Sequence, residues 1–350
     1  MRDLILATVL ITVVAAGCAT RQHDSSDSLP PLDEELAVAR AQLSTQADRY
    51  LDSALDSIQF NHAVGPTFDW EELRLATIER ARGANEPKDT YGAIQFFLSE
   101  LPGGHSSFRE SVAFDGDAPK PPATRVEVSL LDPGAGRIVL PQFVSVDRAA
   151  SDTFATRAQR AIAATSSRVS CGWIVDLRRN GGGNMWPMIA AIGPLLGEGH
   201  VGLSEVRGQP VGQWSYLDGM AMLDSTVLAH ARNPILTIPP EAAAVAVLIG
   251  RDTGSSGEAI AVALRGRART RFFGESTGGA TSSPMSITLS DGVQIQFAGA
   301  FFVDREGTVY RRGLDPDVAV DGRWWESPDA VLDAAVRWLA VEMNCFGESR

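Results

Sequence analysis

The chain has 350 residues, of which 44% are hydrophobic and 21% charged, a composition typical of a soluble globular protein with a sizeable core. Its formal net charge of −12 argues against a nucleic-acid partner, because phosphates are neutralised by clustered basic side chains. Among the 31 basic residues only Lys88 and Lys120 are lysines, which restricts every mechanism that needs a lysine.

The first residues have the features of an export signal. Arg2 precedes an apolar run over 4–16 that is too short to span a bilayer and ends in small residues. The letters AAGC at the end of this run resemble the lipobox of bacterial lipoproteins, which implies that Cys18 is lipidated. A plain cleaved signal peptide is the alternative. We expect a signal peptide over 1–17 and a lipidated cysteine with a polar tether over 18–34.

Three helices are expected after the tether. Residues 35–60, 69–82 and 89–101 carry apolar side chains at helical spacing, and the second stretch begins with an aspartate that can cap a helix. The Pro-Gly-Gly sequence at 102–104 ends the third stretch. We therefore expect an N-terminal helical domain over 35–110.

From residue 125 onward, short apolar runs with β-branched residues alternate with helical stretches. This alternation is typical of an α/β layer with buried, largely parallel strands. Strands are expected at 125–131, 136–143, 171–177, 244–250 and 269–275, and helices at 147–167, 185–197 and 256–267. Two-residue alternation with Asp-Gly and Glu-Gly turns predicts antiparallel hairpins at 286–313. The core domain is expected over 111–325 and a C-terminal helix and tail over 326–350.

Two cysteines, Cys171 and Cys345, remain after the lipobox cysteine. An exported protein can oxidise such a pair to a disulfide, but the spacing does not define a distance. We expect two free thiols, with a disulfide as the alternative. The chain has no C-x-x-C or H-E-x-x-H motif and its five histidines are scattered, so no metal site and no other cofactor is expected.

The stretch 251–264, RDTGSSGEAIAVAL, allows two mechanisms. Asp252 opens a D-T-G-S-S signature of aspartic proteases, whereas Ser255 could be a nucleophile at the start of a helix. A pepsin-like enzyme needs two such loops, and only one Asp-Thr-Gly occurs. The following residues form a helical rather than a strand pattern. We therefore favour the serine, because free N–H groups and the dipole at a helix N-terminus stabilise an oxyanion.

A serine nucleophile needs a base, and no lysine lies downstream of this serine. No histidine follows His230, which excludes the serine, acid, histidine order of α/β-hydrolases. His23 lies in the tether, His62 and His200 lie in turn-like contexts, and His230 lies on an expected helix face. His105 follows two glycines, whose permissive backbone can present an imidazole to a cleft. We expect His105 to be the base and the other four to be surface or satisfied core residues.

In their sequence and order, these motifs resemble those of peptidase family S41, which comprises the C-terminal-processing and tricorn-type serine proteases. The segment 172–184, GWIVDLRRNGGGN, resembles their D-L-R-x-N-x-G-G motif, and 253–258, TGSSGE, resembles T-x-S-x-x-E. The segment 274–281, GESTGGAT, resembles G-x-x-T-x-G, in which the processing branch carries its catalytic lysine; this chain has Ala280 there. The tricorn-like branch uses a histidine instead, which the letters GGHSSF supply.

Within the histidine branch, the chain resembles the group of nisin resistance proteins. The similarity is carried, in order, by YLDSALDSIQFN, FDWEEL, TYGAIQFFLSELPGGHSSF and NMWPMIAAIGPLLGEG, and it covers roughly residues 45–322. Only about thirty residues separate His105 from the strand expected at 136–143, which is too few for a PDZ domain. The resemblance implies an α/β fold: a ClpP/crotonase-like protease core with a mixed sheet flanked by helices, plus an N-terminal helical bundle.

The resemblance also implies roles for single residues. Ser255 would attack a peptide carbonyl, and His105 would act first as general base and then as general acid. The backbone of Gly182 and Gly183 and the N–H of Ser256 would stabilise the oxyanion. Three consecutive glycines after a buried strand also let backbone N–H groups approach a ligand closely. A tight strand-to-helix turn is the alternative for these glycines.

Other residues near the motifs receive weaker assignments. Asn184 and Met185 continue the glycine loop and are expected to line a substrate groove. Asp304 and Glu306 are candidates for a third, orienting acid, with solvation of a hairpin turn as the alternative. Three further charged side chains are expected to brace the site rather than react: Asp176, Arg178 and Glu258.

Taken with the export signal, the motifs predict an envelope-anchored serine endopeptidase that clips exported peptides or proteins, including near their C-termini. Ala19 after the lipobox favours the outer membrane, facing the periplasm, with the lipid as the membrane contact. Two alternatives stay open. One is a non-catalytic peptide-binding module on the same scaffold, and the other is an esterase or amidase of small substrates.

Overall fold

The computed structural model describes residues 32–110, 125–232, 238, 242–322 and 325–345. The expected signal peptide, Cys18 and most of the tether lie outside these ranges, so export and lipidation stay predictions. Across the part of the chain that is described, no helix is both long and apolar enough to cross a membrane.

The N-terminal lobe consists of four α-helices and a short 3-10 helix. These are α1 (Leu32–Arg40), α2 (Thr45–Asn61), α3 (Trp70–Arg80), η1 (Pro87–Thr90) and α4 (Tyr91–Glu100). The Ser44 hydroxyl accepts from Ala47 N–H at 3.1 Å, and Asp69 accepts from Glu72 N–H at 3.0 Å, so both caps satisfy N–H groups that a helix start leaves free. The helices expected at 69–82 and 89–101 are confirmed as α3 and α4, whereas the stretch 35–60 forms parts of two helices, α1 and α2, separated at residues 41–44.

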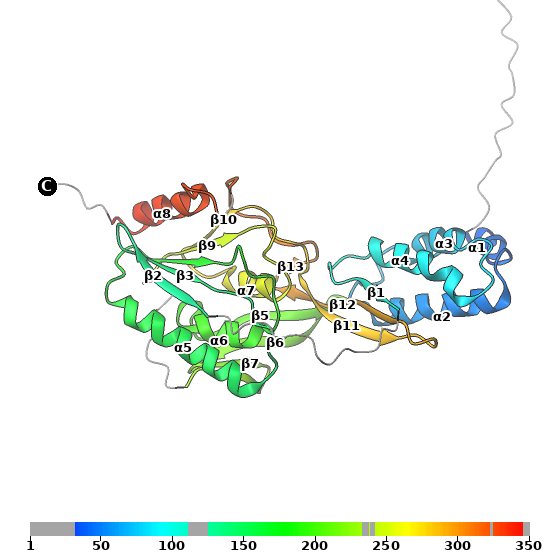
Figure 1. Cartoon of the computed structure of the whole chain (residues 1–350), viewed down its shortest axis with the longest axis horizontal. Helices are drawn as coiled ribbons and strands as arrows, with labels where there is room; N and C mark the ends of the chain where they lie inside the picture. Colours follow the sequence, from blue (N-terminus) through cyan, green and yellow to red (C-terminus); the bar gives the residue numbers. More distant parts are fainter. Residues whose placement is uncertain (1–31, 111–124, 233–237, 239–241, 323–324, 346–350) are drawn as a thin grey trace, which may run out of the picture.

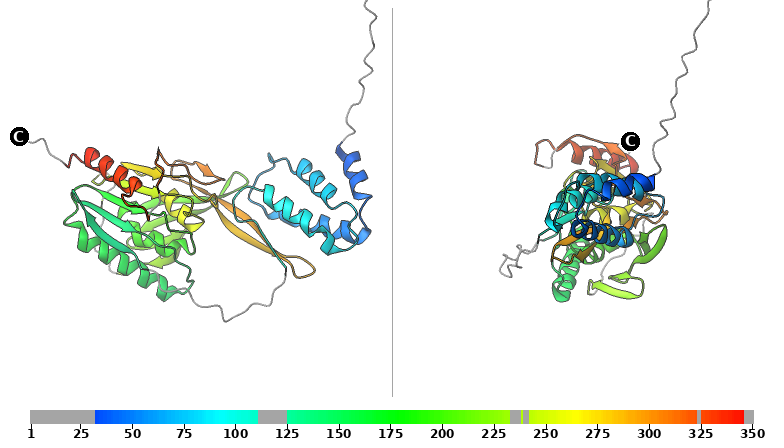
Figure 2. Two further views of the ribbon diagram at one scale, coloured as in Figure 1. Left: turned by 45° about the horizontal axis from the view of Figure 1, so that its top comes forward. Right: turned by 90° about the vertical axis from the view of Figure 1, so that its right-hand side faces the viewer.

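The hydrophobic cluster of this lobe includes residues from the far end of the chain. A long hairpin, β11 (Ser282–Thr288) and β12 (Gln294–Val303), contributes Ile295, Phe297 and Phe301 to the same cluster as the helices. The short strand β1 (Ser107–Arg109) pairs antiparallel with β12. In Figure 2 the hairpin reaches from the core to the helical lobe. The two lobes are therefore joined by strand pairing and by a shared core.

The other lobe is built on a six-stranded sheet of buried apolar strands. Its strands are β2 (Glu127–Leu131), β3 (Ala135–Val139), β4 (Trp173–Asp176), β9 (Val245–Ile249), β10 (Thr270–Gly274) and β14 (Val318–Ala319). The order is β14–β10–β9–β4–β3–β2, and every neighbouring pair is parallel except β2 with β3. This confirms the expected α/β layer of largely parallel strands.

Helices cover both faces of this sheet. On one face lie α5 (Arg148–Ser166), α6 (Met185–Leu196) and α7 (Ser256–Leu264), and on the other lies α8 (Ala330–Glu342). A second sheet packs on the outer side of α6 and α7, while α5 borders its edge, so α6 is buried along nearly its whole length. Figure 1 shows this stack, from α8 through the parallel sheet and the helices to strand β7 (Met220–Leu223) of the second sheet.

Part of the second sheet was not expected from the sequence. It contains β5 (Gly199–Val206), β6 (Gln209–Leu217), β7 (Met220–Leu223), β8 (Thr226–His230) and β13 (Val309–Tyr310), in the order β1–β12–β5–β6–β7–β8, with β11 and β13 also paired to β12. The helix expected at His230 is therefore wrong. Turns with positive φ at Arg207-Gly208 and Asp218-Gly219 connect the first three of these strands, and such pairs match the twist of hairpins.

The expectation of two free thiols is also wrong. Cys171, just before β4, and Cys345, after α8, form a disulfide with their Cα atoms 5.7 Å apart. The two residues are 174 positions apart in sequence, and they meet because α8 packs across the parallel sheet. The bond attaches the C-terminal helix covalently to the start of a central strand.

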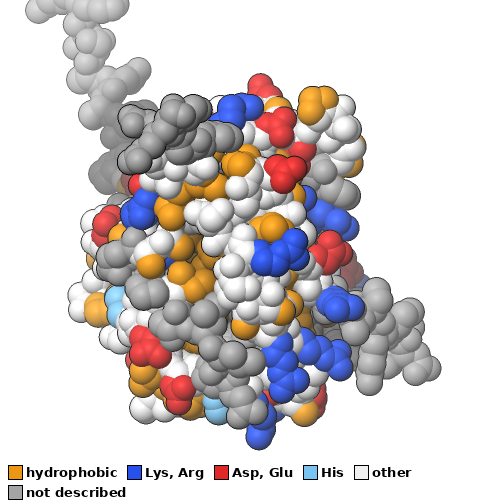
Figure 3. Space-filling model, turned by 90° about the vertical axis from the view of Figure 1, so that its left-hand side faces the viewer, with side chains coloured by type: hydrophobic (Ala, Val, Ile, Leu, Met, Phe, Trp, Pro, Cys, Tyr) orange, Lys and Arg blue, Asp and Glu red, His pale blue; other side chains and the backbone are white. Residues whose placement is uncertain are grey.

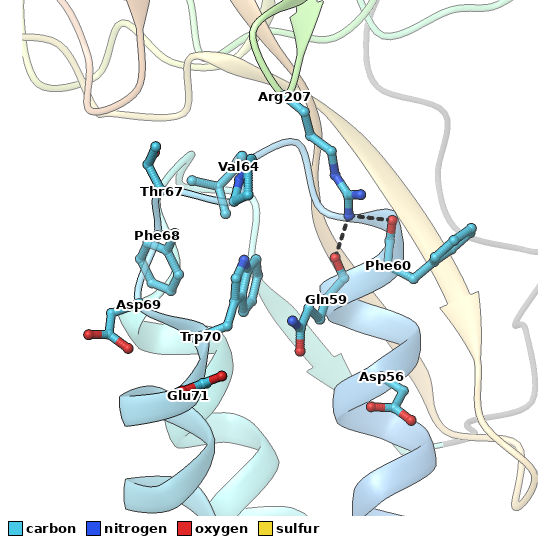
Figure 4. Close-up of a pocket in the computed structure, with 12 residues that line it drawn as sticks. Asp56, Gln59, Phe60, Val64, Thr67, Phe68, Asp69, Trp70, Glu71 and Arg207 are labelled. Atoms are coloured by element: carbon cyan, nitrogen blue, oxygen red, sulfur yellow. Dashed lines mark hydrogen bonds between the residues drawn. The ribbon is translucent and has the colours of Figure 1, made fainter. Parts of the chain in front are cut away.

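Arg207, at the tip of the β5–β6 hairpin, adds a polar contact between the two lobes. The Arg207 guanidinium donates to the carbonyls of Gln59 and Phe60, both at 2.6 Å, and its backbone N–H donates to Ala63 at 2.9 Å (Figure 4). The last carbonyls of a helix have no partner inside the helix, so a cation there provides both hydrogen bonds and a favourable charge.

We expect Arg207→Asn to lower the free energy of unfolding by about 1–2 kcal/mol, because the carbonyls at the end of α2 lose their donors. Asparagine tolerates the positive φ of this position, 53°, so the backbone turn is kept. Urea unfolding measures the change. Arg160→Ala, on the exposed side of α5, is the control and should be neutral. An Arg207→Asn midpoint equal to that of wild type would contradict the role.

Candidate active site

Ser255 lies at a strained strand-to-helix turn between β9 and α7. Its backbone has φ 52° and ψ −120°, a region that residues with a side chain rarely adopt. The Ser255 N–H donates to Glu258 Oε2 at 2.8 Å, and the Gly254 N–H donates to the Asn180 carbonyl at 3.0 Å. A Cβ on Gly257 would lie 2.1 Å from that same carbonyl oxygen, so only glycine fits there. The turn projects the serine hydroxyl from the end of the sheet, a geometry that the nucleophile turns of hydrolases also have.

His105 is presented by a glycine turn from the helical lobe. Gly103 and Gly104 belong to the Pro-Gly-Gly sequence after α4, and their φ angles are 109° and 71°. A Cβ on Gly104 would lie 2.5 Å from the carbonyl oxygen of Gly279, so the histidine turn packs directly on the segment before β11. This packing brings His105 Nε2 to 3.0 Å from Ser255 Oγ, across 150 positions of sequence.

The other ring nitrogen of His105 contacts Ser282, which the sequence did not single out. The Nδ1 to Ser282 Oγ distance is 2.8 Å, and Ser282 Oγ lies 2.8 Å from the Gly103 carbonyl oxygen. A carbonyl can only accept, so the Ser282 hydroxyl donates to Gly103 and its oxygen accepts Nδ1–H. Nε2 then carries the lone pair and accepts from the Ser255 hydroxyl.

Burial lowers the pKa of His105 below its usual value, although the Gly103 carbonyl acts in the opposite direction. The imidazole is therefore neutral near pH 7. A neutral ring whose Nε2 faces a serine hydroxyl is the arrangement that a general base requires.

The glycine loop after β4 lies against the serine turn. A Cβ on Gly182 would be 2.8 Å from Ser255 Cβ, and the Ser256 hydroxyl donates to the Gly183 carbonyl at 2.5 Å. The Gly182 N–H donates to Asn180 Oδ1 at 3.1 Å, so this group of the expected oxyanion site is already engaged. Gly183 N–H and Ser256 N–H have no acceptor within the described residues. Of the expected oxyanion site, these two amides are therefore the ones without an acceptor in the described part of the chain.

Glu258 braces the site from the first turn of α7, as expected. It is fully buried and accepts from Ser255 N–H, from Gly279 N–H at 2.8 Å and from the Thr277 hydroxyl at 2.5 Å. Burial raises its pKa, against the effect of these hydrogen bonds. One carboxyl group thus connects the nucleophile turn with the segment that supports the histidine turn.

The two candidates for an orienting acid do not contact His105, and this expectation is corrected. Asp304 is buried in its own hairpin turn, where it accepts from Glu306 N–H and Thr308 N–H at 2.9 Å each and from the Tyr310 hydroxyl at 2.7 Å. Glu306 is exposed in the same turn. The alternative, solvation of a hairpin turn, fits the exposed Glu306, whereas Asp304 closes the same turn from a buried position.

Asn184 and Met185 make structural contacts, and their expected contact with substrate stays a prediction. Asn184 caps α6, with its side chain accepting from Trp186 N–H and donating to the Ser145 carbonyl, both at 3.2 Å. Met185 is 8% exposed and belongs to the main core. Both residues follow the glycine loop directly, and they fix the start of α6 through a helix cap and through packing in the core.

The remaining histidines lie away from Ser255. His62 is fully buried among Trp70, Phe297 and Phe301, and burial lowers its pKa to about 4. His200 lies in β5 and His230 in β8, while His23 lies outside the described residues. In the described ranges, no group of three or more histidine, cysteine or acidic side chains is placed to hold a metal ion.

The aspartic interpretation of the D-T-G-S-S stretch fails on geometry. Asp252 is exposed, and the chain enters α7 immediately after Ser255. The stretch therefore provides a serine at the mouth of a helix, and its aspartate has no role in the hydrogen-bonded set around His105.

Comparisons with known proteins agree with this geometry. The family model of peptidase family S41 matches residues 134–320, more than half of the chain. The chain belongs to peptidase family S41. It is therefore a peptidase, a hydrolase with a peptide or protein substrate.

Relatives span most of the chain, including the helical lobe. The nisin-resistance protein of Lactococcus lactis subsp. lactis is 28% identical over 279 residues, covering 79% of this chain and 81% of that protein. A lipoprotein structure from Streptococcus agalactiae has a TM-score of 0.57 at 18% identity, covering 85% of this chain and 98% of the other. The photosystem II D1 C-terminal processing protease has a TM-score of 0.52 at 18% identity, covering 85% and 97%. These two structures share the fold.

Proposed function

We propose that this S41 peptidase is a serine endopeptidase in which Ser255 is the nucleophile and His105 the base. The observation that carries the proposal is the contact between His105 Nε2 and Ser255 Oγ at 3.0 Å, with Nδ1 held by Ser282. The tautomer that follows from the Gly103 carbonyl leaves the Nε2 lone pair free for the serine proton.

The proposed reaction proceeds in two halves. Ser255 Oγ attacks the scissile carbonyl carbon as its proton moves to Nε2, and the N–H groups of Gly183 and Ser256 receive the oxyanion. The His105 imidazolium then gives its proton to the leaving amine, which frees one product and leaves an acyl enzyme. Water, deprotonated by the same nitrogen, hydrolyses the ester and restores the serine.

We also propose that the enzyme is exported and anchored through Cys18 to the bacterial outer membrane, facing the periplasm. The sequence of residues 1–18 supports this location. The name of the Lactococcus lactis relative supports peptide antibiotics as one substrate class to test, beside exported peptides of the cell itself.

A peptide-library digest read by mass spectrometry tests the proposal. Wild-type protein should cleave a subset of peptides, and Ser255→Ala should cleave none of them at a measurable rate. Ser53→Ala, an exposed serine of α2, should cleave like wild type. A serine-directed phosphonate that labels wild type and spares Ser255→Ala separates the enzyme from a binding module. Faster turnover of simple esters than of any library peptide would favour the esterase alternative.

The pH dependence of kcat/KM tests the assignment of the base. The base must be neutral, so activity should rise with pH through the pKa of His105 in the free enzyme. Burial lowers that pKa, so the midpoint of the acidic limb is expected below the ordinary histidine value of 6.5. A midpoint well above 8, as a lysine base would produce, contradicts the assignment.

A further inference from the structure

The junction of the two lobes contains a cavity of about 620 Å³ that has one apolar wall and one positively charged wall. The helical lobe contributes an apolar wall from the loop after α2 and from the turn after α4. The core contributes three arginines, Arg207, Arg311 and Arg312. Among the described residues, no acidic side chain lines this cavity, although the protein as a whole carries a net charge of −12.

The positive charge of this cavity is largely uncompensated. Arg207 donates to backbone carbonyls at the end of α2, which are neutral groups. Arg311 pairs with Glu205 at 3.3 Å, whereas Arg312 is exposed and forms no ion pair within the described residues. The adjoining hollow drawn in Figure 4 shares Arg207 and the loop residues 64–68 with this cavity, and its other lining residues include Asp56, Asp69 and Glu71. The charge thus changes from negative to positive along the junction.

The positive cavity borders the turn that carries His105. Pro102, three positions before the histidine, lines it. A Cβ on Gly279 would lie 3.6 Å from the Arg312 carbonyl oxygen, and Gly279 itself packs on Gly104. A chain that reaches the serine hydroxyl between the two lobes would therefore pass close to this cavity.

Other surfaces carry weaker arguments. On the face shown in Figure 3, acidic, basic and apolar side chains are interspersed. A groove of about 970 Å³ along α5 is also lined by arginines that form no ion pair with any described residue, but it begins at Arg125, next to residues outside the described ranges.

We infer that the cavity bordered by Arg207, Arg311 and Arg312 is a subsite for a carboxylate of the peptide substrate. A carboxylate there would gain charge-assisted hydrogen bonds from arginine, and the apolar wall would contact the neighbouring side chain or backbone. The carboxylate can be an acidic side chain or a free C-terminus. This inference rests on the proposed peptidase function.

Binding to the full-length Ser255→Ala protein tests the subsite without turnover. The probes are fluorescein-labelled ten-residue peptides of alanine and leucine, with a single Glu or Gln moved through successive positions, and with a free or an amidated C-terminus. Fluorescence anisotropy should show about tenfold tighter binding of one Glu peptide than of its Gln partner, or of the free acid than of the amide. The first result identifies a side-chain carboxylate and the second a C-terminal one.

Arg312→Gln in the same background should abolish this preference, because Arg312 is the cation without a structural partner. Arg157→Gln, an exposed arginine of α5 distant from this cavity, is the matched control and should keep it. Equal binding of all peptides, or a preference that survives Arg312→Gln, overturns the inference. A carboxylate preference in peptides that wild type leaves intact would instead contradict the proposed peptidase function and leave the subsite standing.

Discussion

Replacing His105 by alanine is expected to lower kcat/KM for peptide hydrolysis by about four to six orders of magnitude, the range found when a base or nucleophile is removed from serine hydrolases. The imidazole contacts the serine hydroxyl at 3.0 Å, and no second base is near it within the described residues. Steady-state kinetics on a peptide chosen from the library digest measures the loss. The His105→Ala, Ser255→Ala double variant should be no slower than either single variant, because both residues move the same proton.

Ser282→Ala provides a graded comparison. The substitution removes the acceptor of Nδ1–H and so leaves the ring less well oriented. We expect kcat to fall by about ten- to hundredfold, which is less than the full contribution of a general base. KM should change little. Ser282→Thr keeps the hydroxyl and should restore most of the rate. A His105→Ala protein that keeps a tenth of wild-type activity, or a Ser282→Ala protein indistinguishable from wild type, would show that the hydrogen-bonded chain is not the catalytic one.

Arg178→Ala is expected to produce the largest loss of stability, about 3–5 kcal/mol in the free energy of unfolding. Arg178 is 4% exposed and contacts both carboxylate oxygens of Asp176, at 3.0 and 2.8 Å, and both of Asp329, at 2.9 and 2.8 Å. Its removal leaves two acidic side chains with too few donors, at the point where β4 meets the start of α8. Urea unfolding at neutral pH measures the change, and Arg160→Ala should leave the midpoint unchanged.

Acid titration of stability provides a second readout for the same variant. Burial alone would raise the pKa of Asp176, but the hydrogen bonds and charges of Arg178 and Arg137 hold the pKa below its usual value. A lowered pKa stabilises the fold above the ordinary aspartate value of 3.8, and this contribution is lost as the pH falls through the folded value. Arg178→Ala should therefore lose less stability than wild type between pH 5 and pH 2. Parallel pH curves would assign the loss to packing instead of charge.

The position of Ala280 explains in physical terms how a histidine can serve where the processing branch uses a lysine. A Cβ on Gly104 would lie 2.8 Å from Ala280 Cα, so the histidine turn packs directly on this residue. A long side chain at 280 would compete with the turn for the same space. The small residue and the glycine turn together bring His105, the proposed base, from the helical lobe to Ser255 of the core.

Several features of this protein were determined by local sequence. The alternation of apolar strands with helices identified the parallel layer, because buried strands and amphipathic helices have different periods. The motif order identified the family and the serine at the mouth of α7. The absence of downstream lysines, together with two glycines before one histidine, was enough to nominate His105. Each motif spans only a few residues, and both the order of the motifs and the census of lysines can be read without knowing any tertiary contact.

Other features were decided only by tertiary structure. Ser282, the disulfide between Cys171 and Cys345, and the cap that Arg207 places on α2 all join positions more than 140 residues apart. Periodicity cannot report such contacts, because it describes the face of one element and not the element that covers it. The order of the strands brings together the turn after β9, the start of β11 and the turn after α4. This arrangement decided that the Ser282 hydroxyl and the Gly103 carbonyl, and not Asp304, orient His105.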